Sequence, residues 1–574
     1  MDISIIIGGE AGAGVMRSGY ILARALVRGG LSVFGMNDYP SLIRGGHNAY
    51  MIHASDKRIH AHRENFDIVV ALNAETITRY VDQLTENAAI IYDPKDRSYA
   101  EKLSDKALLV EIPMMDIVKE EKAKPVMMNS VAIGAAAGLT EYDYEILKSS
   151  ILDSFPKPEV GEINARLAKR GYDIALEEYS SKFKIKVAPL EKDGKQIYLT
   201  GNEAVALGAM QAGMKFYAAY PMTPASPILH FLALHGPKYG IVVVQPESEI
   251  AAINMVIGAA YAGVRAMTAT SGGGFSLMTE ALGLAAMSET PIVVAIAQRV
   301  GPSTGMPTYT AQTDLMFVLN ASQGEFPRFV IAPGDVKECF YRTIEAFNLA
   351  EKFQVPAIIL IDKYLAESHM STEIFDTSNI KIDRGELITG EYKGKEYRRY
   401  EVTETGVSPR AIPSTRNAIV KANSSEHTEY GYASSNALNA VKMQEKRFRK
   451  LKYMIMEMDK LNPAIYYGDP QAELVLIGWG SIKCPVLDAL EILKSMDISV
   501  GFLHFIYLSP FPVKYALKYL KDRKIMLVEN TYTGQLANLL KMHTGLTVDY
   551  KVLRYDGRPI NPSQIVEKVF EVIR

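Results

Sequence analysis

The stretch Phe216–Pro227, FYAAYPMTPASP, joins a short apolar run to a turn that contains three prolines. An apolar run that ends in turn-forming residues indicates a buried strand. Each proline fixes φ and removes a backbone donor, so the turn is rigid and holds the hydroxyl of Thr223 in a defined place. A purely structural turn would explain the prolines as well.

Similar runs recur between residues 195 and 375, namely GIVVVQ, VRAMTATS, PIVVAIAQ, FVIAPG and PAIILID. Strands that alternate with helical stretches predict an α/β fold with a parallel, doubly wound sheet. Several of these runs end in polar residues. Ligands of open α/β sheets bind at the carboxyl ends of the strands, so we expect a binding site at these loops.

Glu249 follows the run GIVVVQ and opens a helix whose continuation, IAAINMVIGAAYAG, is apolar and rich in small residues. One interpretation is an acid that the helix dipole favours at an N-terminus. The other is a partly buried carboxyl whose pKa is raised by desolvation, ready to share a proton with a ring nitrogen. The residues alone do not decide between the two.

Two further loops carry candidates. Ser271 precedes the glycines Gly272, Gly273 and Gly274, which allow a backbone to approach a ligand or another chain closely. Arg299 ends the run PIVVAIAQ in a loop rich in glycine, proline and hydroxyl groups, with Ser303 and Thr304 a few positions on. Its guanidinium suits a carboxylate, although a lone loop arginine is more often part of a surface ion pair.

The chain divides by composition into four segments. Residues 1–190 alternate strands, such as DISIIIGG, FDIVVALN, AAIIYD and ALLVEIP, with helices, and predict a parallel, doubly wound α/β domain that ends in a linker. Residues 195–375 form the second α/β segment. Residues 376–460 read as an irregular arm that ends in a charged helix near Ala437–Lys452. Residues 461–574 form a third α/β unit with the strands ELVLIGWG, ISVGFLHF and KIMLVENT.

Two loops of the first segment have open interpretations. Ile5–Gly14 is a strand that runs into a glycine turn and a helix, where backbone N–H groups can bind phosphate. Its spacing departs from GxGxxG, so a tight turn is favoured over a dinucleotide site, and contact with a coenzyme A phosphate stays open. Tyr39–Asn48, YPSLIRGGHN, is predicted to be a surface loop at a domain contact.

Bulk properties exclude some classes of function. The 574 residues carry 63 basic and 65 acidic side chains, which indicates neither a nucleic-acid nor a membrane surface. No apolar run is long enough to span a membrane, and MDISIIIGG lacks the basic region of a signal peptide, so we expect a cytoplasmic protein. Cys339 and Cys484 are the only cysteines, too few for an iron–sulfur cluster, and we expect both to be buried. Glu426–Glu429, EHTE, lacks metal-ligand spacing, and we predict no metal site in this chain.

These loops, in this order, resemble the α subunit of 2-oxoacid:ferredoxin oxidoreductases with the γ domain fused in front. YPMTPASP is similar to that family's YPITP motif, and Met222 for isoleucine is a volume-conserving departure. QPESEIAAINMVIGAAYAG, TATSGGGFSLM, AQRVGPSTGMPT and GEFPRFVIAPGD resemble its central blocks. GGEAGAGVMRSGYILARAL and YPSLIRGG resemble the γ domain, and GWGSIKCPVLDAL and VENTYTGQLANLL the C-terminal domain.

The resemblance implies that residues 195–375 are the pyrimidine-binding domain of a thiamine diphosphate enzyme and that residues 461–574 are a transketolase-C-like domain. Glu249 then hydrogen-bonds the aminopyrimidine N1′ and activates the cofactor. Thr223 contacts cofactor or substrate, and Arg299 holds the substrate carboxylate, with Ser303 and Thr304 beside it. Cofactor contacts would also come from two groups of residues at the strand ends, Tyr220 with Pro221 and Ser271 with Gly272 and Gly273.

The implied reaction is coenzyme A-dependent oxidative decarboxylation of a 2-oxoacid, with reduction of ferredoxin. The chain has no GDG motif for the Mg²⁺-bound diphosphate, since Gly334-Asp335 and Gly468-Asp469 have the wrong third residue. The family places that motif and a 4Fe–4S cluster on a separate β subunit. We expect 2-oxoglutarate as substrate, with pyruvate possible. An aryl or branched 2-oxoacid enzyme, a nicotinamide-dependent dehydrogenase and a non-catalytic scaffold are the alternatives.

Overall fold

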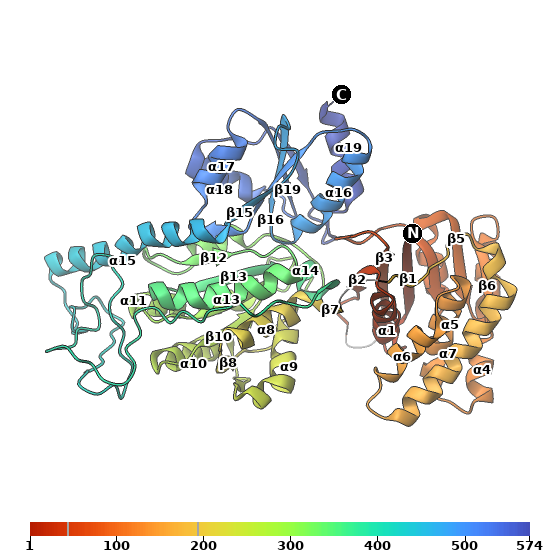
Figure 1. Ribbon diagram of the computed structural model, residues 1–574, viewed down its shortest axis with the longest axis horizontal. Coiled ribbons are helices and arrows are strands. Elements are labelled where there is room, and N and C mark those ends of the chain that lie inside the picture. The colour runs from red at the N-terminus through yellow and green to blue at the C-terminus, as the bar shows by residue number, and fades with distance from the viewer. Residues whose placement is uncertain (43–44, 192–194, 574) are drawn as a thin grey trace. The chain divides into compact units, whose positions relative to one another are not determined.

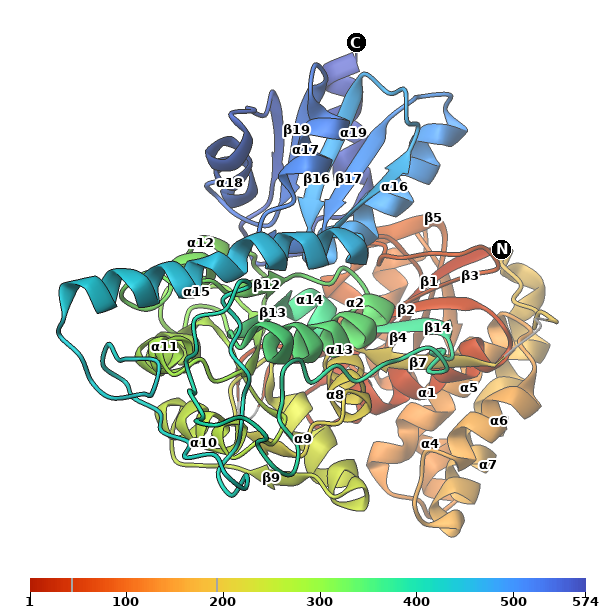
Figure 2. The same cartoon turned by 60° about the vertical axis from the view of Figure 1, so that its left-hand side comes forward.

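The computed structural model describes residues 1–42, 45–191 and 195–573, and these residues form two compact units (Figure 1). The first unit contains Met1–Leu199 and Glu367–Phe375, and the second contains Thr200–Ala366 and Asp376–Arg574. Figure 2 shows the same helices and strands from another side. Both units consist of sheets flanked by helices, which confirms the α/β class expected from the sequence.

The first unit has one eight-stranded sheet in the order β6-β5-β4-β1-β3-β2-β14-β7. The apolar run of β1 lies in the middle of this sheet, where both of its faces are buried. Its strands are β1 (Asp2–Glu10), β2 (Ser32–Asp38), β3 (His47–Ser55), β4 (Phe66–Ala71), β5 (Leu84–Tyr92), β6 (Leu108–Glu111), β7 (Gln196–Thr200) and β14 (His369–Glu373).

This sheet is mixed, so the prediction of a purely parallel sheet is wrong for part of it. Strands β1, β4, β5 and β6 are parallel as expected, but β3 runs antiparallel to both β1 and β2. The loop predicted for Tyr39–Asn48 joins β2 to β3, and His47 and Asn48 already belong to β3. In it Gly45 and Gly46 have φ values of 76° and 82°, a backbone conformation that suits glycine and helps the chain to reverse. Ile43 and Arg44 of that loop lie outside the described residues.

Close helix packing stabilises the first unit. Helices α5 (Met128–Leu139) and α7 (Pro158–Glu178) approach so closely that a Cβ on Gly134 would lie 2.0 Å from the carbonyl oxygen of Ala168. Only glycine fits at such a contact, because any side chain would force the helices apart. The other helices of this unit are α1 (Val15–Arg28), α2 (Ala74–Arg79), α3 (Arg97–Ala100), α4 (Met114–Glu120) and α6 (Tyr144–Leu152).

The second unit contains a seven-stranded sheet in the order β18-β12-β13-β11-β10-β8-β9. All pairs are parallel except β12 with β18. The strands are β8 (Phe216–Ala218), β9 (Val242–Val244), β10 (Ala266–Thr270), β11 (Val293–Gln298), β12 (Phe329–Ile331), β13 (Ala357–Asp362) and β18 (Tyr507–Ser509). The helices between them are α8 (Gly201–Gln211), α9 (Ser226–His235), α10 (Glu249–Tyr261), α11 (Gly272–Met287), α12 (Leu315–Asn320), α13 (Val336–Phe353) and α14 (Lys363–Glu367).

A five-stranded sheet in the order β15-β17-β16-β19-β20 completes the second unit. It confirms the three strands predicted near the end of the chain, and β18 connects this part to the larger sheet through its pairing with β12. The strands are β15 (Ala464–Gly468), β16 (Leu474–Trp479), β17 (Gly501–Phe505), β19 (Lys524–Glu529) and β20 (Tyr550–Leu553). The helices are α16 (Lys483–Ser495), α17 (Val513–Leu520), α18 (Gln535–Thr544) and α19 (Pro562–Ile573).

Residues 376–436 contain no helix or strand, only isolated bridges, and lead into the long helix α15 (Ala437–Met458). This helix confirms the charged helix predicted near Ala437–Lys452. We call residues 376–460 the arm. A buried ion pair fixes the irregular part of the arm, because Glu351 of α13 accepts from Arg410, with 2.9 Å between Oε1 and Nη2. The same carboxylate also accepts from Arg265, which lies directly before β10.

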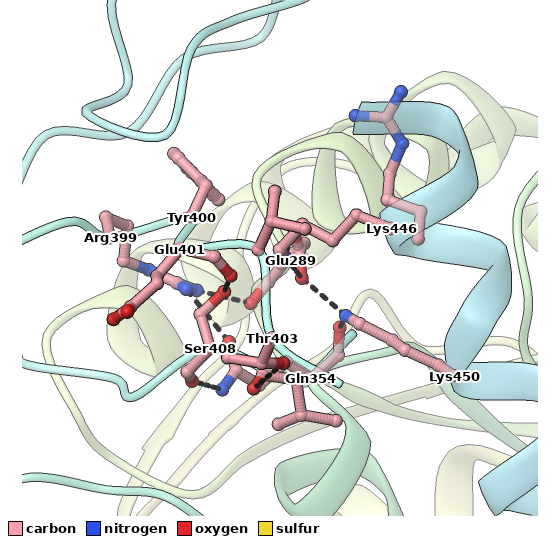
Figure 3. Close-up of polar contacts among 12 residues, drawn as sticks. Glu289, Gln354, Arg399, Tyr400, Glu401, Thr403, Ser408, Lys446 and Lys450 are labelled. Atoms are coloured by element: carbon pink, nitrogen blue, oxygen red, sulfur yellow. Dashed lines mark hydrogen bonds and ion pairs between the residues drawn. The ribbon is translucent and has the colours of Figure 1, made fainter. Parts of the chain in front are cut away.

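A second buried cluster fixes helix α15 (Figure 3). Glu289, in the loop after α11, accepts from Lys446 at 2.6 Å and also from Lys450, and all three side chains are at most 1% exposed. Burial alone would raise the pKa of Glu289, but the attraction of the two lysines outweighs it and holds that pKa below its usual range. Gln354 adds a backbone acceptor for Lys450 and a side-chain acceptor for Arg399. One carboxylate therefore compensates several buried cations.

Glu289→Gln leaves Lys446 and Lys450 buried without a compensating charge. We expect it to lower the free energy of unfolding by about 3–5 kcal/mol, the usual cost of breaking a buried ion pair on one side. Urea unfolding of the full-length chain measures this. The control is Glu491→Gln on α16, an exposed side chain, which should change the value by less than about 0.5 kcal/mol. Equal effects of the two substitutions would contradict the role of the cluster.

Candidate active site

Four neighbouring strands end at one edge of the large sheet of the second unit. Strands β11, β10, β8 and β9 are adjacent and parallel, so the loops that follow them leave the same edge. These are the four loops that carried candidates in the sequence. Carboxyl-edge loops of adjacent parallel strands form the ligand-binding crevice of open α/β sheets.

Glu249 lies at the first position of α10 and is only 3% exposed. The preceding Ser248 caps the helix by accepting from the N–H of Ala251. The carboxyl of Glu249 is therefore not needed as the cap. Its Oε1 atom is buried and has no hydrogen-bond partner among the described residues. A buried acceptor without a partner costs about 1–3 kcal/mol, so this atom is a candidate acceptor for a bound ligand.

The glycine run at the start of α11 lies directly against Glu249. A Cβ on Gly274 would lie 2.6 Å from Glu249 Oε1 and 2.0 Å from Thr270 Oγ1, so only glycine fits here. Ser271 is fully buried, does not cap the helix and has no partner for its hydroxyl among the described residues. Gly273 is exposed and a Cβ there would meet only the sulfur of Met222. The backbone is thus open at Gly273 and tightly packed at Gly274.

The proline turn after β8 contacts the loops after β10 and β11. Met222 Sδ lies 3.9 Å from Thr270 Oγ1, and Arg299 Nη1 donates to the carbonyl oxygen of Thr223 at 2.7 Å. This is the only hydrogen bond of the Arg299 guanidinium with the described residues, and the rest of its fork is available. The pKa of Arg299 is lowered by burial, although Asp314 partly offsets this.

The remaining candidates from the sequence differ in how close they lie to Thr223 and Arg299. Tyr220 and Pro221 lie in the same turn as Thr223, with the Tyr220 side chain 39% exposed. Ser303 and Thr304 are exposed, farther along the loop that begins at Arg299, and neither has a side-chain hydrogen bond among the described residues.

Asp314 is a polar residue of this edge that the sequence reasoning missed. A Cβ on Gly272 would lie 2.3 Å from its Oδ2 atom, so its carboxyl packs on the backbone where α11 begins. The side-chain Oε1 of Gln298 accepts from the Asp314 N–H at 3.0 Å and fixes its position. Burial raises the pKa of Asp314 to about 6, and the nearby Arg299 offsets part of that rise. No motif in the sequence marks this residue, because the loop between Arg299 and Asp314 has no regular structure.

The two acids that resembled a diphosphate motif have structural roles. Asp335 caps α13 and pairs with Lys483, and Asp469 accepts from the Gln471 N–H. Cys339 and Cys484 are both buried, as predicted, and burial raises the pKa of each thiol well above its ordinary value. His427 lies in the segment Glu426–Glu429, for which no metal site was predicted. Its Nδ1 atom is hydrogen-bonded to the carbonyl oxygen of Ser425.

The glycine turn of the first unit is a tight strand-to-helix connection. Gly12 and Gly14 have φ values of 93° and 78°, and Asn129 Nδ2 donates to the carbonyl oxygen of Ala13 at 3.1 Å. Gly14 precedes α1 without a side-chain cap. None of the helices described is both long and apolar enough to cross a membrane.

Two family models match this chain. Residues 207–447 match the family described as "Pyruvate flavodoxin/ferredoxin oxidoreductase, thiamine diP-bdg", and residues 4–174 match "Pyruvate ferredoxin/flavodoxin oxidoreductase". The first of these models spans all four loops of the site. The fold and the site thus define an oxidoreductase chain with a thiamine diphosphate-binding domain.

Relatives of similar length define the family more closely. The α subunits of 2-oxoacid:ferredoxin oxidoreductases from Saccharolobus solfataricus and Aeropyrum pernix are each 34% identical to this chain over 100% of its length and 98% of theirs. The 2-oxoglutarate synthase subunit KorA of Archaeoglobus fulgidus is 33% identical over 65% of this chain and 97% of its own. The chain belongs to the family of 2-oxoacid:ferredoxin oxidoreductase α subunits.

A solved structure agrees over the whole length. The 2-oxoglutarate:ferredoxin oxidoreductase from Magnetococcus marinus, described with 2-oxoglutarate, coenzyme A and succinyl-CoA bound, has a TM-score of 0.92 and 34% identity. The similarity covers 100% of both chains. The family resemblance inferred from the loop motifs is therefore confirmed.

The raised pKa of Asp314 makes stability depend on pH. Between its ordinary value of 3.8 and the folded value of about 6, the folded chain binds more protons than the unfolded chain. Wild-type stability should therefore fall as pH rises through this window, by up to about 3 kcal/mol. Asp314→Asn removes this dependence, so the difference in unfolding free energy between variant and wild type should grow in favour of the variant from about pH 4 to pH 6 and stay constant above.

Urea unfolding over that pH range measures the difference. Asp522→Asn, an exposed site in the same unit, is the control and should differ from wild type by the same amount at every pH. A pH-independent difference for Asp314→Asn would show that this carboxyl titrates normally.

Proposed function

We propose that this chain, together with a β subunit, carries out the coenzyme A-dependent oxidative decarboxylation of a 2-oxoacid, with 2-oxoglutarate favoured and pyruvate also accepted. Acyl-CoA and CO₂ are the products and ferredoxin is the electron acceptor. The observation that carries the proposal is the buried, unpartnered carboxyl oxygen of Glu249 at the carboxyl edge of the sheet, inside the segment that matches a thiamine diphosphate-binding family.

The residues at this edge fit the pyrimidine half of thiamine diphosphate. Glu249 Oε1 is buried and has no hydrogen-bond partner among the described residues. The hydroxyl of Ser271, directly before the glycine run, is also buried and has no partner among them. Gly273 leaves the backbone open to a flat ring, with Met222 and Tyr220 on the adjacent turn. When bound, thiamine diphosphate supplies the nucleophilic carbon that attacks the 2-oxo group and the sink for the electrons left by CO₂.

With thiamine diphosphate bound, Glu249 would hold a proton at a nitrogen of the pyrimidine ring. Because the site is shielded from water, a carboxyl there shares a proton with a heterocyclic nitrogen more strongly than it would in solution. Ser248 makes this possible by capping the helix, which leaves the carboxyl free to point toward the glycine run. Gly274 fixes the position of the carboxyl, since any side chain there would displace it.

Arg299 holds the carboxylate of the substrate. One N–H is tied to the Thr223 carbonyl, which orients the guanidinium and leaves a fork for a bidentate contact. Thr223 and the exposed Ser303 and Thr304 supply hydroxyl groups around it. Asp314 balances the charge of Arg299 when the substrate is absent, and its pKa of about 6 lets it do so near neutral pH.

The chain needs a partner because it holds only part of the site. No GDG motif is present, and the acids that came closest to one serve Lys483 and a turn. The β subunit would supply the Mg²⁺-bound diphosphate site and a 4Fe–4S cluster. Beside the site, α10 and α11 expose the apolar side chains of Ile250, Met255 and Leu277, a surface suited to that subunit.

The substrate preference comes from relatives. The Magnetococcus marinus enzyme, similar over its full length, was solved with 2-oxoglutarate, coenzyme A and succinyl-CoA, and the KorA relatives are named as subunits of 2-oxoglutarate synthase. The broader name 2-oxoacid:ferredoxin oxidoreductase for the full-length relatives supports a wider range that includes pyruvate.

Glu249→Gln tests the catalytic proposal. An amide of the same shape cannot share a proton in the same way, so kcat of the complex with the β subunit should fall about 10²–10⁴-fold. Glu247→Gln, two residues away and exposed, is the matched control and should retain wild-type turnover. Size-exclusion chromatography checks that both variants bind the β subunit. Full activity of Glu249→Gln in an intact complex would refute the assignment.

Arg299→Lys tests substrate binding. Lysine keeps the charge but loses the fork and the tie to Thr223, so kcat/KM should fall about 10–100-fold, the cost of roughly one or two charged hydrogen bonds. Acyl-CoA formation by the complex, assayed with 2-oxoglutarate and pyruvate side by side, gives the size of the loss and the preference of the wild type. A variant with unchanged kcat/KM for both acids would remove Arg299 from the substrate site.

A further inference from the structure

Helix α15 has its polar and apolar faces reversed. The face that packs on the rest of the unit buries three cationic side chains, those of Lys446, Arg447 and Lys450, along with three methionines. The outward face carries large apolar side chains, with Leu438 81% exposed and Val441 56% exposed. A surface helix ordinarily places its apolar stripe toward the core and its charges toward water.

The reversal is firmly fixed. Lys446 and Lys450 are bound to Glu289, and Arg447 makes an ion pair with Glu426 (Figure 3 shows the Glu289 contacts). Turning the helix by half a turn would bury the apolar stripe but would strand Glu289 without its cations, at a cost of several kcal/mol. The outward apolar face is therefore a stable feature of the folded chain.

The outward residues follow a regular spacing of three and four. In order they are Leu438, Val441, Glu445, Phe448, Lys452 and Ile455, with Met456 beside the last, and all are exposed. This is the spacing of a helix seam that packs against another helix. At 22 residues, α15 is about 33 Å long, enough for some three heptads of contact.

The two charges in the stripe are complementary about its centre. Glu445 lies three residues before Phe448 and Lys452 lies four residues after it. Neither makes an ion pair within the part of the chain that the structure describes, and Lys452 Nζ lies 5.8 Å from the centre of the Tyr453 ring. Two antiparallel copies of α15 that cross near Phe448 bring Glu445 of each copy to Lys452 of the other.

We infer that the outward face of α15 is a two-fold interface with a second copy of this chain, formed by antiparallel packing of the two α15 helices about Phe448. A two-fold interface is self-complementary, so the Glu445–Lys452 contact forms twice. Parallel packing would instead place Glu445 on Glu445 and Lys452 on Lys452, which like-charge repulsion disfavours. The symmetric placement of one acid and one base about an apolar centre is what favours a second copy over a different partner.

Charge reversal tests this interface in the full-length chain, alone and in complex with the β subunit. E445K and K452E each place like charges at both contact sites, so each should weaken self-association at least about 10-fold. The double variant E445K/K452E restores opposite charges and should return the dissociation constant to within about 3-fold of wild type. Sedimentation equilibrium measures the constants, and E491K, an exposed charge change on α16, is the control.

Three results would overturn the inference. The wild-type chain could fail to self-associate, alone and in the complex. Both single variants could self-associate as wild type does. The single variants could weaken binding of the β subunit, with no recovery in the double variant, which would assign the face to that subunit. Thermal unfolding of each variant separates a loss of association from a loss of folding. Both side chains are exposed and unpaired among the described residues, so the melting temperature of each variant should match that of the wild type.

Discussion

The unpartnered carboxyl of Glu249 is the constraint on which the site depends. Burying a carboxyl without a hydrogen bond is unfavourable, and folded proteins rarely keep such a group unless a ligand completes it. Three features hold it in place. Ser248 takes over the cap of α10, and Gly274 lacks the Cβ that would displace the carboxyl. The parallel strands β8 to β11 bring the neighbouring loops to the same edge. The stability lost at this one atom is small beside the burial of the sheet that surrounds it.

The same edge explains why the chain carries paired charges there. Arg299 is tethered by a backbone carbonyl and faces a carboxyl, Asp314, that is largely desolvated. An arginine with part of its fork unused and a carboxyl with a pKa near 6 form a site that changes little in charge when an anion binds, because the carboxyl can take up a proton. In the proposed function, binding of a 2-oxoacid carboxylate at Arg299 would favour uptake of a proton by Asp314, because the added negative charge lies close to this carboxyl.

The sequence predicted the strands and loops of this region well because its signals are local. Apolar runs that end at YPMTP, at QPESE and at TSGGG mark both the strand and the edge, and parallel topology then brings the loops together. Asp314 escaped prediction because its position depends on contacts with Gln298 and Gly272 that are distant in sequence. The β2–β3 hairpin was missed for a related reason: the strand His47–Ser55 mixes polar and apolar residues, and reversal at Gly45 and Gly46 reads equally well as a surface loop. Strands β7 and β14 join the first sheet from far along the chain, and pairing over such separations leaves no local pattern.

The sequence pattern of α15 predicted the helix correctly but did not predict which of its faces packs on the rest of the unit. Its apolar spacing alone would place Leu438, Val441 and Phe448 toward the core. The deciding partner is Glu289, a single buried acid more than a hundred residues earlier, whose pairing with Lys446 and Lys450 is worth more than burial of the apolar stripe against this chain. Exposing these apolar side chains to water is unfavourable, and this free-energy cost would be removed if another chain covered the outer face. The buried ion cluster fixes which face of α15 is exposed, and in the inferred two-fold interface it would therefore act on assembly as well as on folding.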